Sequence, residues 1–147
     1  MLLQKDIQAT AISYKKQAVL ITGPAGIGKT TLALHLIERG ATLIGDDCVN
    51  IFIKNNDLYC KPKEKLKGVI EVRGVGLVAS LKVVKDAPVL CVIRLHKKIT
   101  ERLPKPKTIS LLNKKIPVFD FCACNSTEIS VLYSIRTLMG ELTLLKE

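Results

Sequence analysis

The sequence predicts an α/β domain that carries a phosphate-binding loop, a mixed β-sheet and a C-terminal helix. Three observations favour this class. An apolar, strand-like run (residues 18–22) leads into a G-x-x-x-x-G-K-T pattern (residues 23–30), and a helix-like run (residues 31–39) follows. A second apolar run (residues 41–45) ends in two adjacent carboxylates, and the end of the chain has the periodicity of an amphipathic helix. We expect residues 1–147 to form one domain.

The G-x-x-x-x-G-K-T pattern is the signature of a loop that binds nucleotide phosphates. Its glycines allow backbone conformations in which successive N–H groups point at one anion, and the helix that follows adds the positive end of its dipole. Lys29 is expected to reach the outer phosphates, and the Thr30 hydroxyl is expected to ligate Mg²⁺. The residues predicted to bind the nucleotide are Gly23, Pro24, Ala25, Gly26, Ile27, Gly28, Lys29 and Thr30. The sequence therefore predicts a protein that binds a nucleoside triphosphate.

The two adjacent carboxylates, Asp46 and Asp47, are the second chemical feature. A helix and a short strand would return the chain beside the strand that feeds the phosphate loop, so both acids are expected near Lys29 and Thr30. A carboxylate there can hold Mg²⁺ through water or accept a proton from a substrate hydroxyl. The alternative is a polar turn without chemistry. Adjacent carboxylates after a buried strand would raise one another's pKa and gain little from packing, which favours the functional interpretation.

The other apolar runs predict the remaining elements. Residues 13–17 are expected to turn a strand at 7–12 into the strand at 18–22, and the nearly all-apolar run 88–95 predicts a central strand. A final helix is expected to begin at a capping box, residues 125–128. Its predicted apolar face consists of Ile129, Leu132, Ile135, Leu138 and Met139. Further strands are expected at residues 48–53, 58–60, 108–112 and 116–121.

Alternation along residues 69–73 predicts a strand with Glu71 and Arg73 on one face. A charged pair inside such an apolar stretch favours a functional position, and Gly74 and Gly76 would let the backbone approach a ligand. An ordinary half-exposed strand with a bulge is the alternative.

Residues 96–107 carry five lysines or arginines and two prolines, which makes them the best candidate for a mobile loop. Such loops close over phosphates or present a partner surface, and a plain exposed connector is the alternative.

The composition of the chain limits which partners and which cellular location we expect. The net charge is +10, but the lysines are scattered and only three tyrosines and three phenylalanines accompany them, so we expect no nucleic-acid partner. No apolar run is long enough to cross a membrane, and the first residues do not form a signal peptide, so we expect a cytoplasmic protein without a membrane partner. Five cysteines without a CxxC pair, and two histidines, predict reduced thiols rather than a metal site.

Three motifs in register resemble those of one enzyme family. They are the loop at 23–30, the run Glu-Arg-Gly-Ala-x-Leu-Ile-x-Asp-Asp-x-Val at 38–49 and the run Ile-Glu-Val-Arg-Gly-Val-Gly at 70–76, and Glu-Arg-Leu-Pro at 101–104 also fits. On these residues the chain resembles the C-terminal catalytic domain of HPr kinase/phosphorylase, most closely the short form found in alphaproteobacteria. The resemblance implies a phosphate-loop fold related to phosphoenolpyruvate carboxykinase.

The resemblance also implies an activity. It is that of an ATP- and Mg²⁺-dependent protein serine kinase that phosphorylates HPr, the phosphocarrier of the sugar phosphotransferase system, and so regulates that system and carbon metabolism. The family can also run a phosphorolysis, in which inorganic phosphate removes the phosphoryl group and leaves pyrophosphate. Its members form homo-oligomers, commonly hexamers.

By position, the resemblance assigns catalytic roles to four residues and metal-binding roles to two. The catalytic residues are Lys29, Asp46, Asp47 and Arg102, and the metal ligands are Thr30 and Glu71. Lys29 is implied to stabilise the transferred phosphoryl group, and Asp46 to support the metal region. Asp47 is implied to accept the proton of the substrate serine and to return it in the reverse direction.

Two positions depart from the family pattern. Gln8 stands where the family usually has a histidine, and Phe119 and Asp120 stand where the long forms have a basic Arg-Pro-Gly turn. Neither position supplies a cation to hold the attacking phosphate, and Asp120 would add repulsion if it faced the site. We therefore expect a competent kinase that is a weak phosphorylase.

Two other functions remain open. The phosphate loop does not show which molecule accepts the phosphoryl group, so a small-molecule kinase with the same fold is one alternative. A nucleotide-sensing module that binds ATP and a partner with little transfer is the other, and Gln8 is the residue that favours it.

Overall fold

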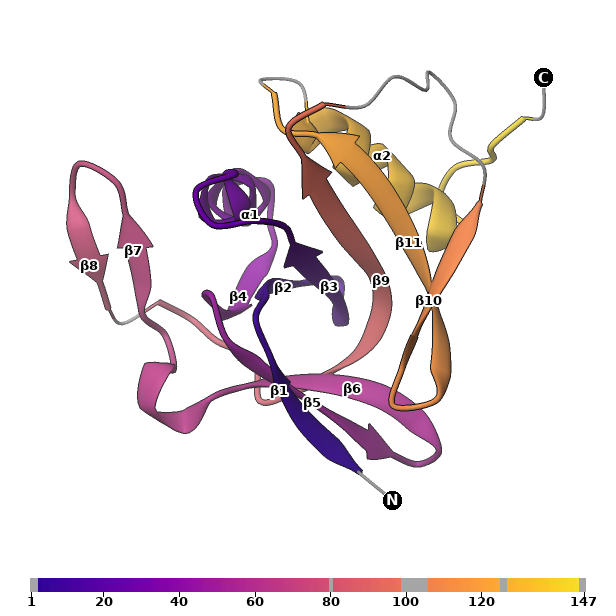
Figure 1. The fold of residues 1–147 in the computed structure, drawn as a ribbon, viewed down its shortest axis with the longest axis horizontal. Helices are drawn as coiled ribbons and strands as arrows, with labels where there is room; N and C mark the ends of the chain where they lie inside the picture. Colours follow the sequence, from indigo (N-terminus) through magenta and orange to yellow (C-terminus); the bar gives the residue numbers. More distant parts are fainter. Residues whose placement is uncertain (1–2, 80, 99–105, 125–126, 146–147) are drawn as a thin grey trace.

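The computed structural model describes residues 3–79, 81–98, 106–124 and 127–145, and these residues form three layers (Figure 1). Two helices, α1 (Lys29–Glu38) and α2 (Thr127–Leu138), cover one face of a mixed sheet. A smaller antiparallel sheet packs on the other face. The prediction of an α/β fold with a mixed sheet and a C-terminal helix is confirmed.

Strand β9 (Ala87–His96) joins the two sheets. Its first residues pair with the smaller sheet, and the rest lies parallel to strands on both sides in the larger one. The larger sheet has the order β4 (Thr42–Gly45), β2 (Thr10–Tyr14), β3 (Gln17–Thr22), β9, β11 (Lys114–Cys122) and β10 (Lys107–Leu111). The smaller sheet has the order β1 (Gln4–Ile7), β5 (Val49–Lys54) and β6 (Asp57–Pro62).

Burial on both faces explains the unbroken apolar runs of the central strands. In β3, Val19 and Ile21 pack under the helices, whereas Ala18 and Leu20 face the smaller sheet. All four side chains are fully buried. Residues 88–95 form most of β9, so the predicted central strand is confirmed.

A short hairpin stands out from the body of the domain beside α1 (Figure 1). It consists of β7 (Ile70–Val72) and β8 (Gly76–Val78), and a 3₁₀ turn (Glu64–Leu66) precedes it. Gly74, with φ of 85°, lies in the turn between the strands. Glu71 thus lies on a two-stranded hairpin separate from both sheets.

Three sequence predictions about the strands and the last helix need correction. The strand expected at 7–12 is two strands: β1 pairs with β5, β2 pairs with β3, and the chain leaves one sheet for the other at residues 8–9. Strand β4 lies beside β2 rather than beside β3. In α2, Ile129 and Leu138 are exposed, because the buried face centres on Val131 and Ile135.

Several local predictions are confirmed. Strands β2 and β3 form the expected hairpin, with Lys15 and Lys16 at positive φ in its turn. Helix α1 gives way to Gly40, whose φ of 105° suits a glycine after a helix C-terminus. The thiols of Cys60 and Cys91 are buried, and burial raises the pKa of each to about 12. Asn125 of the predicted capping box lies outside the described residues.

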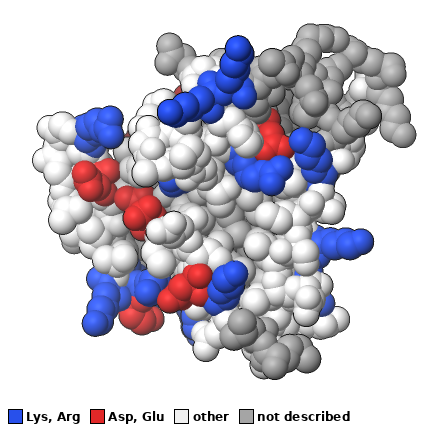
Figure 2. Space-filling view, viewed as in Figure 1, with Lys and Arg blue, Asp and Glu red and all other residues white. Residues whose placement is uncertain are grey.

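The surface shows no single charged field on the face in Figure 2, where basic and acidic residues are interspersed among neutral ones. No helix within the described ranges is long and apolar enough to cross a membrane.

Candidate functional site

The predicted phosphate loop (residues 23–30) connects β3 to α1 and depends on its glycines. Gly26 and Gly28 have φ of 77° and 114°, a region that other residues rarely adopt. At Gly23, a Cβ atom would lie 2.9 Å from the carbonyl oxygen of Leu95 in β9, so only glycine fits at the start of the loop. The Lys29 ammonium donates hydrogen bonds to the carbonyl oxygens of Gly23 at 2.8 Å and Pro24 at 3.1 Å. The loop is therefore held in shape both by its own lysine and by β9.

The Asp46 carboxylate, at the end of β4, connects this strand to three other elements around the loop. Its Oδ1 atom accepts hydrogen bonds from the Thr30 hydroxyl at 2.8 Å and from the Thr10 hydroxyl at 3.0 Å. Its Oδ2 atom accepts a longer one, 3.4 Å, from the backbone N–H of Glu71. These contacts bring together the end of β4, the first turn of α1, strand β2 and the β7–β8 hairpin.

Thr10 is a residue of the site that the sequence analysis missed. Its side chain is almost fully buried, and its hydroxyl oxygen also accepts a hydrogen bond, at 3.2 Å, from the backbone N–H of Asp47. Asp47 has φ of 66°, a strained conformation for a residue with a side chain. The Thr10 hydroxyl therefore holds both the Asp46 carboxylate and the backbone turn at Asp47. A threonine in a strand is common, so the sequence offered no signal for this role.

A cavity of about 310 Å³ brings most of the predicted site residues together. It is lined by Lys29, Thr30, Asp46, Asp47 and Glu71, and also by Arg73 and residues of the loop. Asp47, Glu71 and Arg73 are exposed, so a partner can reach them. Arg102 lies outside the described residues, as does most of the basic segment between β9 and β10. Gln8 is exposed in the link between β1 and β2 and does not line this cavity.

The oxygen atoms around this cavity fit a hard cation. The Thr30 hydroxyl, the Asp46 carboxylate and the Glu71 carboxylate supply only oxygen, which is the donor set that Mg²⁺ prefers. The described residues contain no preformed cluster of three His, Cys, Asp or Glu side chains that would hold a metal by itself. Mg²⁺ is usually bound by one or two carboxylates together with substrate phosphates.

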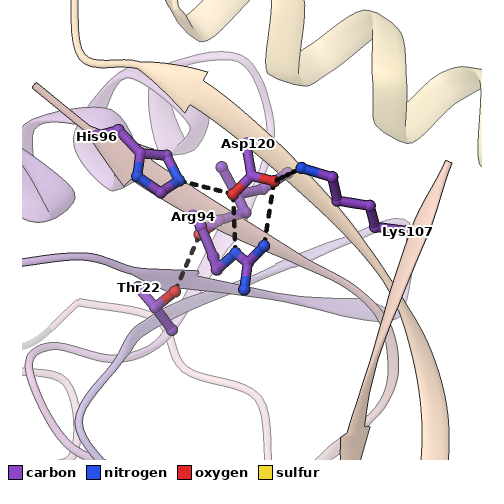
Figure 3. A network of polar contacts seen from close by, with 6 residues as sticks. Thr22, Arg94, His96, Lys107 and Asp120 are labelled. Atoms are coloured by element: carbon purple, nitrogen blue, oxygen red, sulfur yellow. Dashed lines mark hydrogen bonds and ion pairs between the residues drawn. The ribbon is translucent and has the colours of Figure 1, made fainter. Parts of the chain in front are cut away.

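A further carboxylate, Asp120, lies on β11, across β9 from the loop, in a network of basic side chains (Figure 3). Its two oxygens accept hydrogen bonds from Arg94 Nε at 2.8 Å and Arg94 Nη2 at 3.1 Å. His96 Nε2 lies 2.6 Å from Oδ1, and Lys107 Nζ lies 3.2 Å from Oδ2. These partners, Arg94 first, hold the pKa of Asp120 well below its ordinary value.

The surroundings of Asp120 change what the sequence suggested for it. Its side chain is 11% exposed, and its charge is offset by Arg94 and Lys107, with His96 in hydrogen-bond contact. Its neighbours Phe119 and Phe121 pack toward the helices, so Asp120 points to the opposite face of the sheet. Asp120 therefore does not face the cavity that Lys29 and Asp46 line, and the repulsion considered for it does not arise there.

Together, the fold and the site define an α/β domain in which a strand, a glycine-rich loop and a helix lie against a pair of aspartates. The family model "HPr Serine kinase C-terminal domain" matches residues 3–129, and the chain belongs to this family.

Individual relatives agree with this assignment. HPr kinase/phosphorylase of Streptococcus pneumoniae strain Hungary19A-6 is 49% identical over 61 residues, which are 41% of this chain and 20% of the relative. The protein of that name from strain D39 gives the same values. The match therefore spans about a fifth of the length of the curated relatives. A solved structure, "Structure of the Hpr(Ser) kinase/phosphatase from Coxiella burnetii", has a TM-score of 0.82 at 27% identity and covers 93% of this chain and 97% of that one.

Proposed function

We propose that this chain transfers the γ-phosphoryl group of ATP, in a Mg²⁺-dependent reaction, to a serine of an HPr-type phosphocarrier. The observation that carries the proposal is one cavity lined by Lys29, Thr30, Asp46, Asp47 and Glu71. Family membership supports the choice of acceptor. Regulation of the phosphotransferase system, a cytoplasmic location and a homo-oligomeric, hexameric assembly belong to the same proposal, with residues 1–147 acting as one catalytic domain.

The residues that line the cavity have different roles in the proposed phosphoryl transfer. The loop N–H groups and Lys29 bind the phosphates and neutralise charge as the γ-phosphoryl leaves. Thr30 and Glu71 would hold Mg²⁺, with Asp46 beside them, and the bound cation would supply positive charge to the phosphates of the nucleotide. The serine Oγ forms a bond to the γ-phosphorus while the bond from that phosphorus to the bridging oxygen breaks, and ADP departs.

Asp47 is the residue proposed to take the proton of the attacking serine. Its carboxylate is exposed at the cavity, whereas Asp46 is tied to two hydroxyls and one N–H group. A carboxylate that is not engaged by fixed donors is the better proton acceptor, because hydrogen bonds to the charged form stabilise it. In the reverse direction Asp47 returns the proton to the serine oxygen.

The direction of the reaction is part of the proposal. Phosphorolysis must bring inorganic phosphate close to a phosphoserine, and unit charges about 4 Å apart repel by roughly 4 kcal/mol at an effective dielectric constant near 20. Neither Gln8 nor Phe119 and Asp120 supplies a cation, and the cations of the described residues that line the cavity are Lys29, which the ATP phosphates need in the forward direction, and Arg73. We therefore expect weak phosphorolysis. Pyrophosphate release from phosphoserine-loaded HPr at millimolar phosphate, as fast as forward transfer, would contradict this expectation.

The main experiment incubates the protein with labelled ATP, Mg²⁺ and purified HPr. Label on HPr, lost when the acceptor serine of HPr is replaced by alanine, supports the proposal. Label that appears only on small molecules from an extract supports a small-molecule kinase instead. ATP binding without transfer to either acceptor supports a nucleotide sensor. Asp57→Asn, which changes an exposed carboxylate at the start of β6, is the matched control for variants of the site.

A further inference from the structure

Strand β10 forms one edge of the larger sheet, at the rim of the molecule (Figure 1). It pairs with β11 on one side, and within the described ranges no strand lies on its other side. Its central residues, Thr108, Ile109 and Ser110, are uncharged, and Thr108 and Ser110 are exposed. Edge strands of soluble proteins usually carry charges or prolines that prevent pairing with another chain. The middle of β10 has neither protection.

The turn after β10 indicates which backbone groups point away from the sheet. Residues 112–113 connect β10 to β11 as a two-residue turn, and both have positive φ. Leu111 and Lys114 flank this turn and so form a hydrogen-bonded pair, and such pairs alternate along an antiparallel ladder. The N–H and C=O groups of Thr108 and Ser110 therefore point away from β11, where a further strand would pair.

This edge of β10 is complementary to itself. When two copies pair antiparallel about a two-fold axis at Ile109, Thr108 of each copy lies opposite Ser110 of the other. The outward N–H and C=O groups then meet in the geometry of hydrogen-bonded pairs, which gives four backbone hydrogen bonds. Ile109 lies opposite its own counterpart, and Lys107 lies opposite Leu111, so no like charges face each other.

An apolar groove of about 850 Å³ lies beside β10 on the face of the sheet that carries α2. It is lined by Thr108 of β10, Phe119 of β11, Tyr133 of α2 and Leu144. Tyr133 is 52% exposed and Leu144 is 79% exposed, so apolar surface at the groove is in contact with water. Pairing at β10 places the grooves of two copies side by side, and each copy then covers apolar surface of the other.

We propose that β10 is a two-fold contact between two copies of this chain, which joins their larger sheets into one. The inference rests on the homo-oligomeric assembly of the proposed function and names one of its surfaces. A two-fold contact uses the same surface on both copies. An extended segment of another protein would satisfy only the backbone groups of the edge. A second copy brings both the matching strand and the matching groove.

Ser110→Pro tests the contact, because it removes an outward N–H group and leaves the pairing with β11 in place. We expect it to halve the mass of the assembly, from a hexamer to a trimer or from a dimer to a monomer. Light scattering measures the mass, and circular dichroism shows whether the variant folds.

Gln4→Pro is the matched control. On β1, at the edge of the smaller sheet, the Leu3 carbonyl oxygen accepts a hydrogen bond from Ile53 N–H, so the N–H group of Gln4 also points outward. Gln4→Pro should leave the mass of the assembly as in the wild type.

Ile109→Cys keeps the proposal testable if Ser110→Pro does not fold. Opposite residues at a non-hydrogen-bonded position of antiparallel strands have Cα atoms about 4.5 Å apart, a distance that a disulfide spans. Oxidised glutathione should therefore link two copies of Ile109→Cys. The wild type, whose five cysteines give the background, and Gln4→Cys should not show this link.

Two outcomes would overturn the contact at β10: an unchanged mass of folded Ser110→Pro, or Ile109→Cys that links no more than the wild type. A wild type that is monomeric would overturn the proposed assembly together with the contact. The labelled-ATP experiment tests phosphoryl transfer independently of both, so the failure of one proposal is distinguishable from the failure of the other.

Discussion

The two sides of the phosphate loop hold carboxylates in opposite ways. Asp46 is bound by two hydroxyls and a backbone N–H, and within the described part of the chain neither it nor Asp47 forms an ion pair. Asp120 is bound by Arg94, His96 and Lys107. In both sites the carboxylate oxygens accept hydrogen bonds, but only the partners of Asp120 neutralise the charge of the carboxylate.

This difference indicates which carboxylates are available for chemistry. Neutral donors fix the position of Asp46 and leave its negative charge to attract a cation such as Mg²⁺. At Asp120 the basic partners neutralise the negative charge, so the carboxylate does not attract a further cation. It instead cross-links β9, β10 and β11. The number of hydrogen bonds alone would not distinguish the two sites, whereas the charge of the donors does.

The largest expected effect comes from Asp47, whose carboxylate has no hydrogen bond or ion pair within the part of the chain that the structure describes. Asp47→Asn should lower transfer by about 10²–10⁴-fold, because an amide cannot accept the serine proton. ATP affinity should stay within a few-fold of wild type. Steady-state transfer and equilibrium ATP binding measure the two effects. A mild Asp47→Asn beside a severe Asp46→Asn would mean that the two aspartates have the opposite roles.

Lys29→Ala should lower transfer by about 10²–10³-fold, because one cation at the developing charge is lost. Its bonds to two loop carbonyls are lost as well, so circular dichroism should accompany the rate measurement to show that the fold persists. Lys115→Ala, an exposed lysine on β11, is the control and should retain full activity. Wild-type turnover in a folded Lys29→Ala would refute the assignment of the phosphate loop.

Substitutions of Thr10 test whether its uncharged hydroxyl group positions Asp46 and Asp47. Thr10→Val keeps the shape but removes the hydroxyl, so Asp46 loses one donor and the Asp47 N–H loses its acceptor. We expect transfer to fall about tenfold, with a higher Mg²⁺ concentration needed for half-maximal rate. Thr10→Ser should restore both. A drop in thermal stability without any change in Mg²⁺ dependence would show a structural role only.

Asp120→Asn should affect stability rather than transfer. Loss of the charged hydrogen bonds should cost about 1–3 kcal/mol of unfolding free energy at pH 7, with transfer within about twofold of wild type. The folded pKa of Asp120 lies below its ordinary value of 3.8, so this stabilisation is present above that value and is lost as the pH falls toward the folded pKa. Urea unfolding of both proteins at pH 7 and pH 3 should show a smaller difference at the lower pH.

The sequence was informative wherever chemistry requires a particular residue. Chemistry fixes the identity of the loop glycines, of Lys29 and of the two acids after the second apolar run. Another residue there would lose the required backbone geometry or charge, so these positions formed a recognisable sequence pattern. Thr10 was not visible, because its role depends on residues 36 and 37 positions away. The place of β4 beside β2 was missed for a similar reason. Hydrophobic periodicity shows which face of a strand is buried but not which strand lies next to it.

The dependence of the loop on β9 has a consequence for folding. The carbonyl oxygen of Leu95 sits against Gly23, and Thr22 is paired with Arg94. These contacts close a chain segment of about 70 residues, and such closure is slow because its entropy is lost before the contacts form. We therefore expect the nucleotide site to form late during refolding, after the local β2–β3 hairpin. Pulse-labelling hydrogen exchange should then show protection in β2 before it shows protection at the carboxyl end of β9.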